Sequence, residues 1–194
     1  MPNQDAQRWN DRYAHDGGLW QKRRPRQLLL DYAHLLPKTG LALDAASGVA
    51  LHGLFLAERG LHVIALDISE IGLRFALESA RAKGVWLETA VVDLANPWLP
   101  TNTFDVIVNF RFLERPAFPI YRRALKPGGL LLFETFLKTE ANQDYPDHYL
   151  SAGELRNAFG GWEVLHSAVV EQSKPDLDRR KVTEQLIARK PQPA

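Results

Sequence analysis

The sequence predicts an α/β protein: a Rossmann-like, doubly wound sheet of seven strands, mostly parallel, with an antiparallel C-terminal hairpin and helices on both faces. Short apolar runs, typical of buried strands, alternate with segments of helical apolar spacing along most of the chain. The last two runs, 162–170 and 182–189, are joined by a polar segment without helical character. Because parallel neighbours normally need a helical crossover, these two strands are expected to pair antiparallel.

Turn-forming and capping residues bound the individual elements. Gly60 and Gly84 stand where helix C-caps belong, and Ser69 is a suitable N-cap. Residues 126–129, Lys-Pro-Gly-Gly, are expected to form a turn into the fifth strand. The strands are predicted over 41–45, 62–67, 85–92, 104–109, 130–135, 162–170 and 182–189, and the helices over 28–36, 50–60, 69–83, 116–125 and 151–159.

The length of 194 residues favours a single domain over 1–194, made of an N-terminal helical segment (1–36) and a sheet core (41–190). Trp9 and Tyr13 lie on one face of a possible helix in the first segment. They are expected either to pack into the core or to fold over the site as a lid.

Composition excludes several classes of function. The chain has no cysteine, so disulfide frameworks and thiolate catalysis are excluded, and its six histidines show no metal-ligand spacing, so no metal site is expected. Lys plus Arg (24) nearly balance Asp plus Glu (23), and the basic cluster 22–26 is interpreted as a solvated segment leading into a helix. Nucleic acid is therefore not an expected partner.

Hydropathy gives no sign of a membrane segment. The apolar runs are far too short to span a bilayer, and the polar N-terminus lacks the apolar stretch of a signal peptide. We expect a cytoplasmic protein that does not associate with membranes.

The loop after the first strand, 44–50, is the first candidate for chemistry. Its small residues would allow a ligand to approach the backbone where a helix begins, and free helix N–H groups favour an anionic group. The dinucleotide pattern would require glycine at Leu51, and Asp44 would repel a pyrophosphate. A nucleotide-dependent oxidoreductase is thus the less favoured alternative.

Five segments carry a family resemblance. The strings LALDAASGVALHGLFLAERG, HVIALDIS, VVDL, FDVIVNF and LKPGG, in this order over 41–135, resemble the class I S-adenosylmethionine-dependent methyltransferases. The length, Trp9-x-x-x-Tyr13 and Phe112-Leu-x-Arg115 are most similar to small bacterial enzymes of the tellurite-resistance type.

The resemblance implies S-adenosylmethionine as cofactor, with S-adenosylhomocysteine as product, and a set of binding residues. In the first-strand loop, the methionine part would be cradled by Asp44, Ala45, Ala46, Ser47 and Gly48. Asp67, at the end of the second strand, would bind both ribose hydroxyls, and Ile68 would pack on adenine. Asp93 and Leu94, after the third strand, would recognise the adenine edge. Asn109 and Phe110, after the fourth strand, would lie near the methionine carboxylate and sulfonium.

The expected reaction is direct in-line methyl transfer to a small-molecule acceptor. No residue is assigned as a catalytic base, and the candidates for the acceptor pocket are Tyr13, Arg111, Glu134, Tyr145, His148 and Tyr149. Ala46 and Ala50 stand where the family usually has glycine, so either residue would be strained if its φ is positive. This departure motivates the alternative of a catalytically inactive protein that binds S-adenosylmethionine and regulates or activates a partner.

Overall fold

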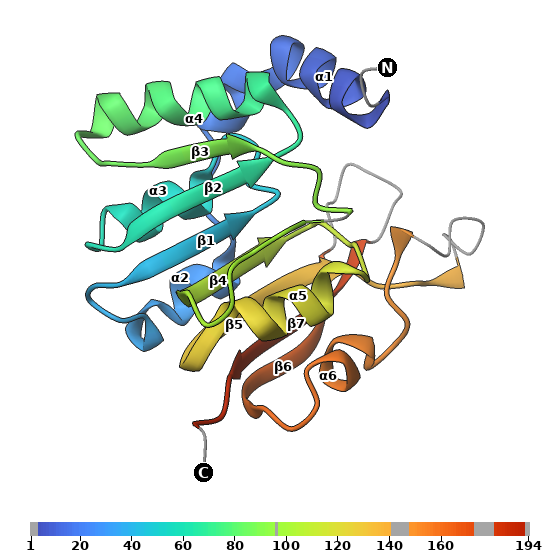
Figure 1. The fold of residues 1–194 in the computed structure, drawn as a ribbon. Helices are drawn as coiled ribbons and strands as arrows, with labels where there is room; N and C mark the ends of the chain where they lie inside the picture. Colours follow the sequence, from blue (N-terminus) through green and yellow to red (C-terminus); the bar gives the residue numbers. More distant parts are fainter. Residues whose placement is uncertain (1–3, 96, 141–147, 173–180, 193–194) are drawn as a thin grey trace.

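Seven strands form one sheet in the order β3-β2-β1-β4-β5-β7-β6 (Figure 1). The computed structural model describes residues 4–95, 97–140, 148–172 and 181–192. Strands β1 to β5 are parallel, and β7 is antiparallel to both of its neighbours. The predicted fold class and its C-terminal hairpin are therefore confirmed. The strands are β1 (Leu41–Ala45), β2 (His62–Asp67), β3 (Glu88–Val91), β4 (Phe104–Phe110), β5 (Leu125–Phe136), β6 (Glu163–Gln172) and β7 (Lys181–Arg189).

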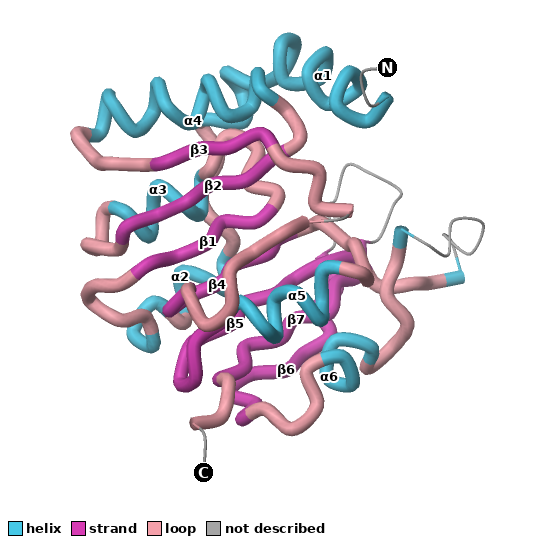
Figure 2. The backbone as a smooth tube through the Cα atoms, in the orientation of Figure 1, coloured by secondary structure: helices cyan, strands magenta, loops and turns pink. Residues whose placement is uncertain are grey.

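Helices cover both faces of the sheet (Figure 2). On one face, α2, the short 3-10 helix η1, α3 and α4 enclose a core that includes Leu29, Leu56 and Leu132; on the other, α5 and α6 enclose Phe133 and Phe159. The helices are α1 (Gln4–Gln21), α2 (Gln27–Asp31), η1 (Ala33–Leu35), α3 (Leu51–Ala57), α4 (Glu70–Lys83), α5 (Ala117–Ala124) and α6 (Glu154–Ala158). Among the described residues, no helix combines the length and the hydrophobicity that a membrane span requires.

Several predicted boundaries need correction. The expected helix 28–36 breaks at Tyr32 into α2 and η1, and the helices expected over 50–60 and 151–159 shorten to α3 and α6. The strand expected over 85–92 keeps only four residues, because β3 is an edge strand that pairs with β2 alone. The residues predicted as a turn, 126–129, fall within the bounds of β5, but they have no partner on β4: the register passes from Phe104–Leu125 to Val106–Leu130, and Gly128 has a positive φ of 78°.

Helix α1 packs on α4 rather than directly on the sheet. Asn10 Oδ1 accepts hydrogen bonds from Ser69 Oγ (2.7 Å) and Ile71 N (3.2 Å), at the first turn of α4. Further along, Gln21 Nε2 donates to Phe75 O (3.0 Å) and to Ser79 Oγ (2.9 Å). These contacts hold α1 beside the carboxyl ends of β1 and β2, where Figure 1 shows it at the margin of the sheet.

Candidate functional site

The order of the strands reverses between β1 and β4, which are adjacent although two helices and two strands separate them in the chain. The carboxyl ends of parallel strands β1 to β5 meet at the same edge of the sheet (Figure 1). In open α/β sheets, ligands bind beyond this edge at the point of reversal. The residues that follow β1, β2, β3 and β4 are therefore the ones to inspect.

The loop after β1 has an unusual backbone. Ala46, Gly48 and Ala50 all adopt left-handed conformations, with φ of 53°, 56° and 53°. Ser47 N donates to Leu66 O (2.9 Å), which fixes the loop to the end of β2. The loop thus keeps its tight path even though alanine replaces glycine at two positions, each at a cost of about 1–2 kcal/mol.

Asp44 is almost fully buried at the end of β1. Its Oδ2 accepts a hydrogen bond from Gly53 N (2.7 Å) in the first turn of α3. Burial raises the pKa of Asp44 to about 7, against the lowering effect of that hydrogen bond, and the charge of Asp67 raises it further. A cationic group bound nearby would favour the ionised form of this carboxyl.

Asp67 joins the two loops at the ends of β1 and β2. Its Oδ2 accepts from Gly48 N (2.7 Å) and its Oδ1 from Ser69 N (2.8 Å). Each carboxylate oxygen has a further lone pair, so both can accept a ligand hydroxyl as well. Burial raises the pKa of Asp67 above its ordinary value, while the backbone hydrogen bonds lower it.

Two buried polar atoms beside this loop have no hydrogen-bond partner among the described residues: Ser47 Oγ and His52 Nε2. The His52 ring stacks on Phe110, with 4.2 Å between ring centroids, and its Nδ1 lies 4.0 Å from Asp44 Oδ1. Burial, Arg26 and Arg111 lower the pKa of His52 to about 3, so the imidazole is neutral at physiological pH. His52 is not among the residues predicted from the sequence; its place in the first turn of α3, next to the loop, was the available signal.

Tyr13 on α1 closes over the loop. Its ring lies between Gly48 and Gly72: a Cβ at Gly48 would overlap the tyrosine hydroxyl, and one at Gly72 would make a tight contact with the ring. Trp9 stacks on Tyr13 (5.8 Å) and Trp20 meets it edge-on (4.8 Å), which makes an aromatic cluster above the site. Tyr13 is buried against the loop, as the packing alternative expected, and its role as a lid stays a prediction.

The other predicted cofactor residues lie along the same edge. Ile68 is half-buried directly after Asp67, and Val92 N donates to Asp67 O (2.9 Å), which brings the end of β3 alongside. Asp93 is exposed and its Oδ1 accepts from Ala95 N (2.9 Å), whereas Leu94 is buried. Their predicted roles toward adenine are compatible with these positions.

The pair at the end of β4 is engaged within the protein. The fully buried Asn109 donates from Nδ2 to Phe112 O (2.9 Å) and accepts at Oδ1 from Tyr121 OH (3.2 Å). Phe110 packs under His52. The side chain of Asn109 therefore supports the backbone after β4, and its full burial leaves its predicted contact with a cofactor as a prediction.

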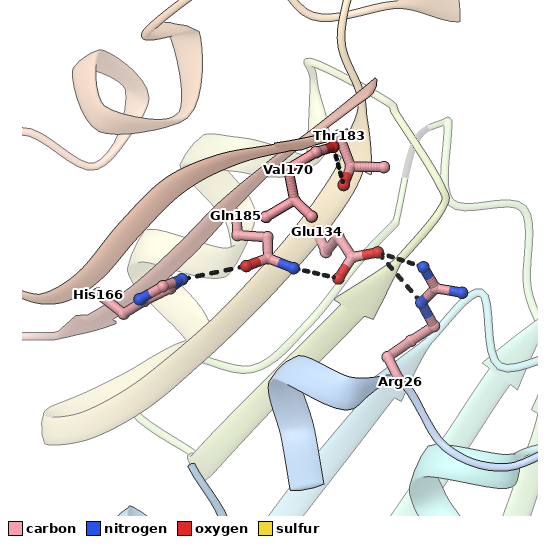
Figure 3. Close-up of polar contacts among 6 residues, drawn as sticks. All are labelled: Arg26, Glu134, His166, Val170, Thr183 and Gln185. Carbon is pink, nitrogen blue, oxygen red and sulfur yellow. Dashed lines mark hydrogen bonds and ion pairs between the residues drawn. The ribbon is translucent and has the colours of Figure 1, made fainter. Parts of the chain in front are cut away.

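Glu134, at the end of β5, is part of a polar network that the sequence did not predict (Figure 3). Its Oε1 accepts from Arg26 Nη2 (2.6 Å) and Nε (3.1 Å), and its Oε2 from Gln185 Nε2 (2.9 Å). His166 and Tyr32 continue the network from Gln185. The interpretation of 22–26 as wholly solvated was wrong for Arg26, whose side chain is about 22% exposed.

The remaining acceptor candidates are spread more widely. Arg111 has a positive φ of 60°, and burial together with the charge of Arg26 lowers its pKa to about 10. Its guanidinium lies 5.1 Å from the centroid of the Phe136 ring, and Tyr149 packs on the same ring (6.4 Å). His148 is exposed, and Tyr145 lies outside the described residues.

The residues at this edge fit the cofactor that the resemblance implies. A buried hydroxyl of Ser47 without a partner can donate to a carboxylate, Asp67 can accept two hydroxyls, and Asp44 can stabilise a cationic group. Among the described residues, no group of His, Asp and Glu could hold a metal ion.

Comparison with known proteins agrees with this geometry. Residues 42–129 match the family model described as a methyltransferase domain. A phosphoethanolamine N-methyltransferase of Triticum aestivum is 32% identical over 147 residues, which are 69% of this chain but 29% of that protein. The putative methyltransferase YqeM of Bacillus subtilis is 27% identical over 58% of this chain and 49% of its own length. The chain thus spans less than a third of that plant relative and about half of the bacterial one.

Solved structures share the fold. TehB from Haemophilus influenzae superimposes with a TM-score of 0.76 at 18% identity, covering 94% of this chain and 67% of that chain. A SAM-dependent methyltransferase from Methanosarcina mazei gives a TM-score of 0.70 at 20% identity, covering 87% and 99%. Residues 42–129 match a methyltransferase domain by sequence, and the chain shares its fold with TehB and with this SAM-dependent methyltransferase.

Proposed function

We propose that this protein transfers a methyl group from S-adenosylmethionine to a small-molecule acceptor. The observation that carries the proposal is the convergence of Asp44, Asp67 and the left-handed loop 46–50 at the point where the strand order reverses. The match of residues 42–129 to methyltransferase domains supports it. The name of the plant relatives adds an amine nitrogen as a candidate for the atom that is methylated.

Each cofactor-binding residue would have a distinct task. Asp67 would accept hydrogen bonds from the two ribose hydroxyls while its backbone contacts hold the loops in place. Ser47 would donate to the methionine carboxylate, and Asp44 would face the cationic part of the cofactor. Ile68, Asp93 and Leu94 would surround the adenine, in the order in which β2 and β3 present them.

When bound, the cofactor supplies a methyl group already activated on a sulfonium, so the protein mainly has to align the acceptor and exclude water. Tyr13 and its aromatic neighbours on α1 would exclude water, because they cover the loop from the side opposite the sheet. No described side chain is assigned as a general base.

Calorimetric titration with S-adenosylmethionine, S-adenosylhomocysteine and NAD tests the binding half of the proposal. We expect both adenosyl ligands to bind and NAD not to bind. Asp67→Ala should weaken S-adenosylmethionine binding by about 1–3 kcal/mol, because charged hydrogen bonds are lost. Asp16→Asn, an acid on α1 outside the loop, serves as the control that should leave affinity unchanged. Unaltered affinity in Asp67→Ala would remove the ribose assignment.

Turnover is tested separately by transfer of a labelled methyl group to a panel of small acceptors, which includes phosphoethanolamine because of the named relatives. Formation of S-adenosylhomocysteine that depends on an acceptor supports an enzyme. Tight cofactor binding without any turnover across amines, thiols, alcohols and carboxylates would instead favour the inactive, regulatory alternative.

A further inference from the structure

A cavity of about 370 Å³ lies between α2 and the neighbouring strands β5, β7 and β6. In the described part of the chain, α2 and its flanks line one side with Arg26, Asp31 and Tyr32. The strands line the other with Glu134, Gln185 and His166, and Figure 3 shows four of these polar residues joined in a row. This volume is typical of sites for small molecules.

The chemistry of Glu134 fixes the direction of every hydrogen bond in that row. A carboxylate only accepts, so Gln185 must donate its amide NH₂ to Glu134 and turn its carbonyl oxygen toward His166. His166 Nε2 must then donate to Gln185 Oε1 (3.1 Å). In a neutral imidazole this leaves Nδ1 as an acceptor, so Tyr32 donates its hydroxyl hydrogen to Nδ1 (2.9 Å).

The cavity consequently presents mainly acceptors. The Tyr32 oxygen has donated its hydrogen and keeps its lone pairs, and Asp31 adds a carboxylate. Glu134 is only 1% exposed, and its two oxygens already accept from Arg26 and Gln185. Arg26 is the one cation among the described lining residues, and it already directs Nε and Nη2 at Glu134. The lining therefore carries a net negative charge and an aromatic ring, which suits a positively charged donor.

The cavity also adjoins the cofactor edge. Glu134 pairs with Phe110 in the register of β5 and β4, and Phe110 stacks on His52 at the start of α3. The Arg26–Glu134 pair thus stands between the cavity and the loop that follows β1. The cavity is linked to Asp44 through Glu134, Phe110 and His52, whose Nδ1 lies 4.0 Å from Asp44 Oδ1.

We propose that this cavity binds the amino group of the methyl acceptor, as an ammonium that donates to Asp31 and Tyr32. An ammonium has no lone pair, so methylation of this nitrogen would first require the loss of one proton to solvent. The acceptor is then a small primary amine rather than a carboxylate or a phosphate ester without an amine. An anion in the same place would face the carboxylate of Asp31, while the charge of Arg26 is balanced by Glu134. This inference rests on the proposed function and names its substrate class.

Three probes of the same shape test it: benzylamine, benzyl alcohol and benzoate, titrated into the full-length protein saturated with S-adenosylhomocysteine. We expect benzylamine to bind at least about fivefold more tightly than either of the others, because a partly buried charge pair contributes about 1 kcal/mol. Equal or tighter binding of benzoate would overturn the inference.

Two variants locate the binding. Asp31→Asn should weaken benzylamine about two- to fivefold and leave benzyl alcohol unchanged. Its matched control is Asp11→Asn: Asp11 accepts from Gln7 Nε2 on α1 (2.8 Å), just as Asp31 accepts from Gln27 Nε2 on α2 (2.6 Å), but it lies away from the cavity. Tyr32→Phe should weaken both hydroxyl and amine probes. An unchanged benzylamine affinity in Asp31→Asn and Tyr32→Phe would contradict the assignment.

The titration with S-adenosylhomocysteine distinguishes failure of the proposed function from failure of the amine assignment. If that ligand does not bind, the proposed function fails. If it binds and the amine is not preferred over benzyl alcohol and benzoate, the proposed function stands and only the amine assignment falls.

Discussion

The ring of Tyr13, on the N-terminal helix α1, packs against the backbone of Gly48. Gly48 is the second of the three residues in the loop after β1 that have a positive φ. Gly48→Ala should therefore be destabilising for two reasons: a left-handed φ of 56° costs about 1–2 kcal/mol for alanine, and the added methyl would displace Tyr13. The free energy of unfolding, measured with urea, should fall by about 2–3 kcal/mol.

Gly84 provides the matched control for this variant. It has a similar φ of 65°, but nothing lies within 4 Å of a Cβ built there. Gly84→Ala should thus cost only the conformational part, about 1 kcal/mol. Equal losses in the two variants would show that Tyr13 does not restrain the loop in solution.

The strained alanines in the same loop give the opposite expectation. Ala46 is half-buried, so Ala46→Gly relieves a left-handed conformation with little loss of packing and should stabilise the fold by about 0.5–1 kcal/mol. Ala50 is fully buried, and Ala50→Gly also removes a packed methyl, worth about 0.8 kcal/mol, so its net effect should lie near zero. Thermal unfolding of both variants checks this order, and a destabilised Ala46→Gly would mean that the loop follows another path.

The sequence predicts those residues of the site whose position depends on nearby residues, and not those that depend on contacts with distant parts of the chain. Asp44 and Asp67 were predictable because each acid lies at the carboxyl end of a buried strand, and these ends converge once the sheet is parallel. The pairing of Arg26 with Glu134 joins residues 108 positions apart, and a guanidinium in a basic run looks like any solvated charge. Its burial is decided by the course of the chain from α1 into α2, which hydropathy does not specify.

In the fold, too, features set by local sequence were predictable and features set by tertiary contacts were not. The hairpin of β6 and β7 followed from a connection too polar for a helix, and it was confirmed. Residues Lys126-Pro-Gly-Gly129, predicted as a turn, lie within the bounds of β5, but the register with β4 passes from Leu125 directly to Leu130. The positive φ of Gly128 agrees with the local turn propensity, whereas its N–H donates to Lys190 O, a tertiary contact that local propensity does not predict.

Binding of S-adenosylmethionine should depend on pH through Asp44. The pKa of about 7 in the free protein lies above the ordinary value, so the folded chain holds a proton between roughly pH 4 and 7 that the unfolded chain does not. The stability from this protonation is present in acid and is lost as the pH rises through 7. A bound cation favours the carboxylate, so affinity should increase from pH 5.5 to 7.5 with release of a proton.

Calorimetry in two buffers of different ionisation enthalpy measures how many protons are released when S-adenosylmethionine binds. Asp44→Asn should reduce both the proton release and the slope of affinity against pH. Part of the slope should persist in this variant, because the pKa of Asp67 is also raised by burial. A pH dependence identical to that of the natural chain would show that Asp44 does not sense the ligand.

The Arg26–Glu134 pair should be far more important to stability than an exposed ion pair. Glu134 is only 1% exposed, so Arg26→Met leaves an uncompensated buried carboxylate, and the free energy of unfolding should fall by about 3 kcal/mol at neutral pH. Arg74→Met, which breaks the exposed pair with Glu70, should change it by less than about 1 kcal/mol. In the double variant Arg26→Met with Glu134→Gln, the buried charge is gone, and at least half of the loss should be recovered. Urea unfolding of the natural chain, the two single arginine variants and the double variant measures these free energies. If the double variant recovers no stability, the cost of Arg26→Met comes from lost packing of the arginine side chain and not from the unpaired charge of Glu134.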